Sequence, residues 1–73
     1  MNYSELEELF NKISFHMFQI DNNINILNTL VEDLGIEDHS TLAHLQTVLR
    51  TFYSIVQEKY ETRKNEIIRE EEK

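Results

Sequence analysis

Apolar residues recur at alternating steps of three and four along the first half of the chain, and this spacing constrains the fold more than any other feature. In heptad notation the apolar residues fill the a and d positions without a break, which predicts one amphipathic helix with a coiled-coil-like seam. The series is Leu6, Phe10, Ile13, Met17, Ile20, Ile24, Leu27, Val31 and Leu34, with Tyr3 as a candidate leading member.

The sequence also marks where this helix begins and ends. Ser4 is followed three residues later by Glu7, the spacing of a capping box in which each side chain accepts from a free backbone N–H of the first turn. Gly35 is the single glycine, and it follows the last apolar member of the series. A glycine there is typical of the left-handed residue that ends a helix. We therefore expect a helix over about 4–34.

A second helix is predicted over about 40–70, after a turn over about 35–39. Asp38 or Ser40 is expected to cap it, because either side chain offers an oxygen to the first turn. Its apolar positions cover an arc wider than a two-stranded seam requires. They are Leu42, Leu45, Val48, Leu49, Phe52, Tyr53, Ile55, Val56, Tyr60 and Ile67.

So short a connection implies antiparallel neighbours, and the fold class is therefore all-α, an antiparallel two-helix hairpin. Folding the chain at Gly35 is expected to pair Met17 with Tyr60 and Phe10 with Ile67. Residues 1–73 are expected to form a single domain, and the charge run that ends it is expected to fray.

Composition narrows the classes of function. The chain has one glycine, no proline and no cysteine, which favours long helices and excludes disulfides and thiolate metal sites. Its formal charge of −7 argues against nucleic acid or an anionic membrane as a partner. Apolar runs are too short to span a bilayer, and the acidic N-terminal residues lack the basic region of a signal peptide. A cytoplasmic location is the expectation.

Two helices alone cannot cover all of the apolar surface. Large apolar residues flank both seams, and leaving them in water forfeits roughly 1.5–3 kcal/mol for each large side chain. We expect the hairpin to be completed to a four-helix bundle, by dimerisation or by a helical protein partner. The candidate oligomer-interface residues are Leu9, Leu30, Val48, Phe52 and Ile55.

A separate group of apolar residues lies off the predicted seam. Phe15, Phe18 and Ile26 fall within three turns of the first helix, and Phe15 stands nearly opposite the a and d positions. This group is either a docking patch with aromatic anchors or a face packed inside a larger bundle.

No pattern of catalytic or ligand-binding residues was found. Carboxylates are not expected on the buried, apolar side of either helix, where burial would raise their pKa for acid–base chemistry. His39 and His44 lie near acidic residues of the turn, but no standard metal-ligand spacing is present, and we expect them to titrate freely. His16 is expected at the edge of the bundle. We expect no enzymatic activity, no cofactor, no metal and no small-molecule substrate.

The two-helix layout resembles the plasmid copy-control hairpins that dimerise into four-helix bundles and bind RNA, and also the small helical-hairpin chaperone subunits of secretion systems. RNA binding does not carry over, because those proteins use a basic face that this acidic chain lacks.

The leading hypothesis is an adaptor or inhibitor that binds another protein. The Asn- and Ile-rich stretch from Asn22 to Ile26 suggests an AT-rich genome, which would suit a phage or mobile-element regulator. The alternatives are a purely structural homo-oligomer and an acidic mimic of nucleic acid.

Overall fold

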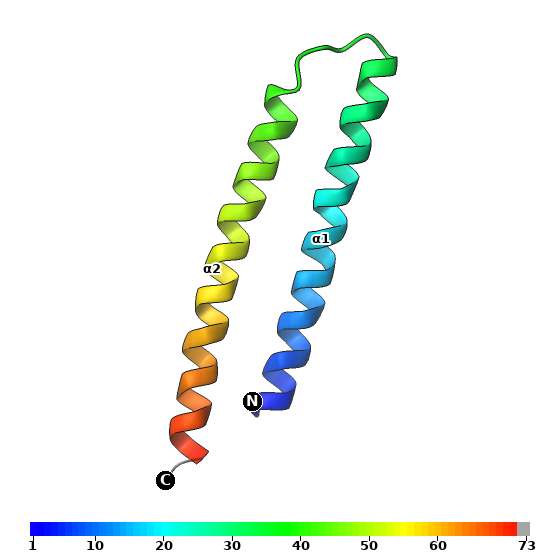
Figure 1. Ribbon diagram of the computed structural model, residues 1–73. Coiled ribbons are helices and arrows are strands. Elements are labelled where there is room, and N and C mark those ends of the chain that lie inside the picture. Colours follow the sequence, from blue (N-terminus) through cyan, green and yellow to red (C-terminus); the bar gives the residue numbers. More distant parts are fainter. Residues whose placement is uncertain (72–73) are drawn as a thin grey trace.

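The computed structural model describes residues 1–71 and contains two helices, α1 (Tyr3–Asp33) and α2 (Ser40–Glu71), and no strand within that range. The helices lie side by side and antiparallel, so the start of α1 and the end of α2 lie at the same end of the molecule, here called the open end (Figure 1). The predicted all-α hairpin is confirmed. The last two residues of the charge run expected to fray, 72–73, lie outside the described residues.

Asn2, rather than Ser4, caps α1. Its Oδ1 accepts from the backbone N–H of Glu5 at 2.8 Å, and its carbonyl accepts from the N–H of Leu6 at 3.0 Å. The capping-box interpretation of Ser4 and Glu7 was therefore wrong. Asn is as effective as Ser at this position, and its earlier place in the chain lets Tyr3 join the first turn.

Gly35 ends α1 as predicted. It has a φ of +95°, a conformation that L side chains rarely adopt. The N–H of Ile36 donates to the carbonyl of Val31, and the N–H of Gly35 donates to that of Glu32, both at 2.9 Å. This pair of bonds is the Schellman arrangement, which satisfies carbonyls left over at the end of the helix.

Asp38 caps the start of α2, one of the two alternatives that the sequence left open. Its Oδ1 accepts from the backbone N–H of Ser40 at 2.9 Å. The hydrogen bonds from the Ser40 backbone and side chain, and then the nearby His39, lower the pKa of Asp38.

The pairing of the helices differs from the predicted register by about one heptad. Phe10 stacks on Tyr60, with ring centroids 4.2 Å apart, although the predicted register placed Tyr60 opposite Met17. The connection does not fold back tightly at Gly35. It arches over the end of α1 and descends before α2 begins, so α2 extends beyond α1 at the open end (Figure 1).

The seam between the helices changes position along α1. Near the open end Leu6 and Ile13 lie inside the hairpin, while toward the turn Asp21 and Asn28 take the equivalent place. The predicted seam residues Ile20, Leu27 and Leu34 are exposed, as is Leu45 on α2. A straight helix of 3.6 residues per turn drifts by about 20° per heptad against a strict seven-residue repeat, so the d positions leave the seam.

The core is correspondingly small. Among residues 1–71 only Leu6, Met17 and Ile24 are buried, and all three belong to α1. The accessible surface is 5951 Å² for a chain of 8.8 kDa. A compact folded monomer of that mass exposes only about 4,800 Å². The hairpin therefore leaves open a surface that an ordinary monomer would have buried.

Candidate interaction surface

Eight large apolar side chains stand exposed beside the seam. They are Leu9, Ile20, Leu27, Leu30, Leu45, Val48, Phe52 and Ile55, and we call this set the apolar face. Every one of them immediately precedes a partly buried seam residue in the chain. The seam residues that they precede are Phe10, Asp21, Asn28, Val31, Gln46, Leu49, Tyr53 and Val56.

This shared position in the sequence puts all eight on one side of the hairpin. One step back along a helix is a rotation of about 100°. Along each helix, the four residues of the apolar face are therefore rotated in the same sense from the seam residues of that helix. Because the helices run antiparallel and face each other, the same sense of rotation on both leads to the same side of the pair. The apolar face therefore extends across both helices.

The opposite side of the hairpin is polar. The residues that follow seam residues there include Asn25 and Glu32 on α1 and Arg50, Ser54 and Gln57 on α2. Phe18 and Ile68 are large apolar exceptions. The exposed large apolar side chains are thus concentrated on one side of the hairpin.

All five predicted oligomer-interface residues, Leu9, Leu30, Val48, Phe52 and Ile55, lie on the apolar face. Sequence reasoning missed three further members, because Ile20, Leu27 and Leu45 had been assigned to the seam. Their exposure could have been predicted from the sequence. A helical period of 3.6 residues, used in place of a strict heptad, moves the d positions out of the seam.

Polar contacts near the turn hold the two helices in register. Gln46 of α2 donates from Nε2 to Oδ1 of Asn25 at 2.7 Å, and at 3.4 Å to Oδ1 of Asp21. Asp21 is half-buried between the helices, so the expectation that no carboxylate would lie there was wrong. The half-buried amide and carboxylate are matched across the seam, and a slip of register would break these bonds.

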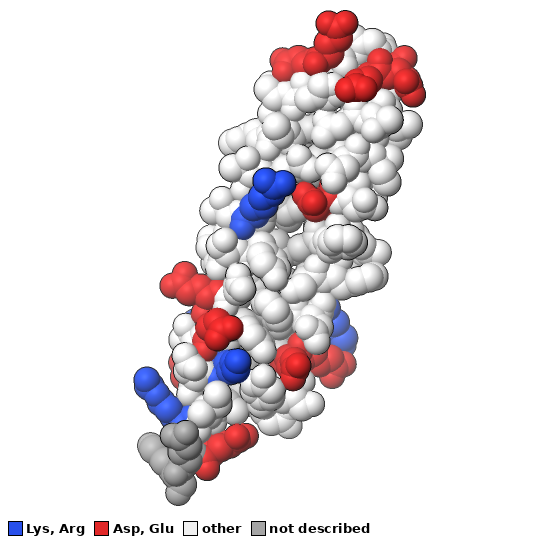
Figure 2. All heavy atoms as spheres, in the orientation of Figure 1, with Lys and Arg blue, Asp and Glu red and all other residues white. Residues whose placement is uncertain are grey.

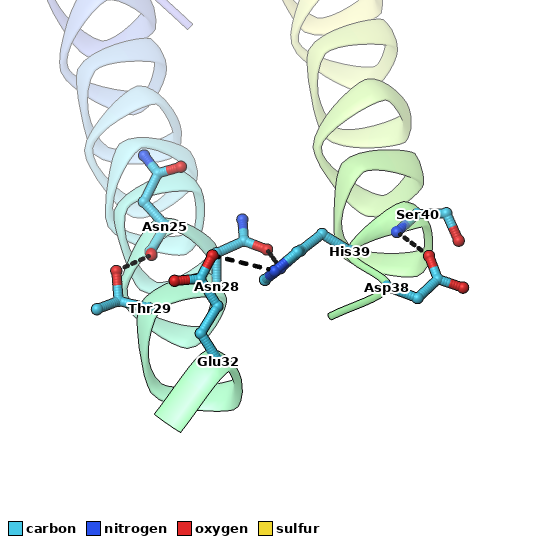
Figure 3. A network of polar contacts seen from close by, with 7 residues as sticks. All are labelled: Asn25, Asn28, Thr29, Glu32, Asp38, His39 and Ser40. Carbon is cyan, nitrogen blue, oxygen red and sulfur yellow. Dashed lines mark hydrogen bonds and ion pairs between the residues drawn. The ribbon is translucent and has the colours of Figure 1, made fainter. Parts of the chain in front are cut away.

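His39 forms a second link, just before α2 begins. Its Nδ1 lies 2.8 Å from Oδ1 of Asn28, and its Nε2 lies 3.2 Å from Oε1 of Glu32 (Figure 3). Both partner atoms are oxygens able to accept a hydrogen bond, and each ring nitrogen of His39 faces one of them. His39 therefore ties the turn to α1.

A hollow marks the open end of the hairpin. It has a volume of about 580 Å³ and is lined by residues of both helices, including Leu9, Ile13, Lys59, Arg63 and Ile67. Leu9 belongs to the apolar face, and Lys59 and Arg63 share its position immediately before a partly buried residue, so the hollow opens on the same side of the hairpin. At the turn end, by contrast, apolar side chains such as Leu30 and Leu34 protrude.

Phe15, Phe18 and Ile26 do not belong to the apolar face. All three are exposed on α1, away from α2 or on the polar side. Phe15 and Phe18 are neighbours at a spacing of three residues, while Ile26 lies about 12 Å farther along the axis from Phe18. We call these three residues the outer patch.

Charge is distributed unevenly along the hairpin. Residues 13–49, which include the turn, contain five acidic residues and no Lys or Arg. Figure 2 shows acidic side chains gathered over the turn, and mixed acidic and basic ones near the open end. The acidic residues therefore concentrate at the ends of the visible face rather than forming a line along it.

Residues 1–71 contain no group of three or more His, Asp or Glu side chains arranged to hold a metal ion. His16 lies edge-on to Phe15, with ring centroids 5.6 Å apart, and His44 is exposed. Neither described helix is long and apolar enough to cross a membrane. Comparison with protein-family models, curated proteins and solved structures finds no match to this chain.

Proposed function

We propose that this chain is a non-catalytic protein-interaction module whose apolar face seats another helical chain. The observation that carries the proposal is the one-sided exposure of eight large apolar side chains, contributed by both helices. A contiguous apolar surface of this kind on a folded protein marks an interaction site. Seating helices on it would complete a four-helix bundle.

The energetics of burial support a partner of comparable length. Each of the eight side chains is roughly half exposed. Covering the exposed half contributes about 0.7–1.5 kcal/mol per residue, or about 6–12 kcal/mol for the whole face. Association costs about 4–15 kcal/mol in lost freedom. Covering only part of the face would therefore not offset this cost. Covering its full length offsets the cost when the partner buries a comparable apolar surface of its own, which adds a second gain of the same size.

The role that fits this surface is that of a small adaptor or inhibitor, as expected for a phage or mobile-element regulator. The outer patch is the place where a bundle built on the apolar face would hold a second protein. A purely structural homo-oligomer is the alternative favoured by the same surface. A nucleic-acid mimic is less favoured, because its carboxylates should line one outer face, whereas on the visible face they gather toward the ends of the hairpin.

Site-specific photocrosslinking in the cells that make the protein tests the proposal. A photoreactive phenylalanine analogue is placed at Phe52, on the apolar face, and in a matched control at Thr51, its exposed neighbour on the outer side of α2. We expect covalent protein adducts from position 52 and few from position 51. Equal or absent adducts at both positions would refute the proposal.

A further inference from the structure

We infer that the occupant of the apolar face is a second copy of this chain, laid face to face in the opposite direction, with its turn over the open end of the first. The inference rests on the proposed function, since it names the partner for the same surface. Three observations carry it: the area left open, the shapes of the two ends and the distribution of charge.

The area matches what a stable dimer needs. The hairpin measures 61 × 17 × 10 Å between Cα atoms, so its broad side has a footprint of about 1,000 Å². Two copies that cover each other's apolar face bury about 2,000 Å², which lies at the upper end of standard interfaces and the lower end of obligate ones. A second copy also has the same length, so it leaves neither end of the face uncovered.

The shapes of the two ends favour opposite orientation. The open end carries the 580 Å³ hollow, lined by Leu9, Ile13 and other residues. The turn end carries protruding side chains, among them Leu30 and Leu34. When the copies run in opposite directions, the leucines of each turn end enter the hollow of the other copy. When they run in the same direction, two hollows face each other and leave a void, and voids in a core are costly.

The charges favour the same arrangement. Five acidic residues and no Lys or Arg occupy residues 13–49. A dimer with both turns at one end would bring these two acidic halves together. The opposite orientation separates them and places each turn near Lys59 and Arg63, which line the hollow of the other copy. The rest of the chain carries nine acidic and seven basic residues, so this orientation replaces contact between two acidic segments by contact of each with a nearly balanced one, which lessens the repulsion.

Both arrangements of the pair follow a two-fold axis, so a single labelled position distinguishes them. The chain has no cysteine, and Glu37→Cys therefore introduces one spin-label site in the turn. In the opposite orientation the two labels lie about 45 Å or more apart, the length of α1. In the same orientation they lie about 10–25 Å apart, set by the spacing of packed helices.

Ser54→Cys serves as the matched control, because Ser54 lies near the middle of the hairpin's length. Its labels should lie within about 20–35 Å in either orientation, which reports that the dimer has formed. Pulsed electron–electron dipolar spectroscopy measures both distances on the purified chain. A long distance at position 37 with a short one at 54 supports the inference. Short distances at both positions overturn the orientation, and no dipolar coupling at 54 overturns the second copy.

A pair of phenylalanine substitutions identifies the surface that the second copy covers. Phe52→Glu alters the apolar face and Phe15→Glu the outer side of α1, and the two side chains are 53% and 58% exposed in the hairpin. Sedimentation equilibrium should show that Phe52→Glu raises the dissociation constant of the dimer at least tenfold, and that Phe15→Glu changes it little. The reverse order would place the interface on the outer patch.

The failure of this inference is distinguishable from the failure of the proposed function. Adducts from position 52 with the mass of two copies support the dimer. Adducts with a different protein, together with a monomeric purified chain, overturn the second copy while leaving the proposed function in place. Absence of any adduct overturns the proposed function itself.

Discussion

Two isoleucines two residues apart on α1 provide a direct test of where the core lies. Ile24 is 7% exposed and lies in the seam, whereas Ile26 is 49% exposed on the outer side. Truncation of each to alanine makes the same chemical change in the same helix. Any difference between the two variants therefore reports their environments.

The expected magnitudes follow from burial. Ile→Ala removes three carbon atoms, worth about 2.4 kcal/mol when fully buried. Alanine is the better helix former by about 0.4 kcal/mol, which offsets part of the loss. Because the narrow core can relax around the missing atoms, we expect Ile24→Ala to lower the free energy of unfolding by about 2 kcal/mol, at the lower end of core truncations. For Ile26→Ala we expect a loss of about 0.5 kcal/mol.

Urea denaturation followed by circular dichroism at one fixed protein concentration measures both variants. With a slope of about 1 kcal/mol/M, as for the smallest proteins, the midpoint should fall by about 2 M for Ile24→Ala and by about 0.5 M for Ile26→Ala. Equal shifts would refute the assignment of the seam. A larger shift for Ile26→Ala would show that the outer patch is the more deeply buried surface in solution.

Three further experiments test the helix ends and the open end. Asn2→Ala should lower the free energy of unfolding, measured by urea denaturation, by about 1 kcal/mol, because the Asn2 side chain accepts a hydrogen bond from the first turn. Ser4→Ala should lower it little. The reverse order would show that Ser4 is the capping residue. Gly35→Ala should lower the free energy of unfolding by about 1 kcal/mol, because alanine disfavours the positive φ at this position. Nothing lies within 4 Å of an added Cβ, so no steric clash adds to this loss, and Gly35→Asn should lower the stability less. An unchanged melting temperature for the alanine variant would count against the left-handed turn. A hydrogen bond with Tyr3, then desolvation and nearby charges, raises the pKa of Tyr60 to about 12. The folded chain therefore favours the neutral form of Tyr60. The stability that this form contributes is present below about pH 10 and is lost as the pH rises toward 12. Tyr60→Phe should remove that part of the alkaline loss of helicity, and an identical alkaline titration of both proteins would contradict it.

The hairpin itself was predictable because its determinants are local. A regular apolar spacing needs only a helix to place its members on one side, and Gly35 needs only its own backbone freedom to end that helix. Leu9, Leu30, Val48 and Ile55, four of the five predicted interface residues, were recognisable as surplus apolar positions from their helical angles alone. None of these inferences required the position of the other helix.

The register and the membership of the seam were not predictable in the same way. The stacking of Phe10 on Tyr60 depends on the path of the connection, since a link of a few residues can fold back tightly or arch over the end of the helix. Similarly, the placement of Asp21 inside the hairpin and of Leu27 outside it depends on how far α1 turns before it meets α2. A heptad pattern leaves a rotation of about 20° per repeat undetermined.

The sequence by itself determined that this chain forms two long helices, where the first one ends, and that its apolar residues exceed what two helices can cover. These properties follow from spacing and from the conformational preferences of single residues. Only the tertiary structure decided that the excess lies on one side of the hairpin, with a hollow at one end and protruding leucines at the other. The physical reason is that a side chain's exposure depends on the rotation of both helices about their axes, and packing fixes that rotation only when the helices meet.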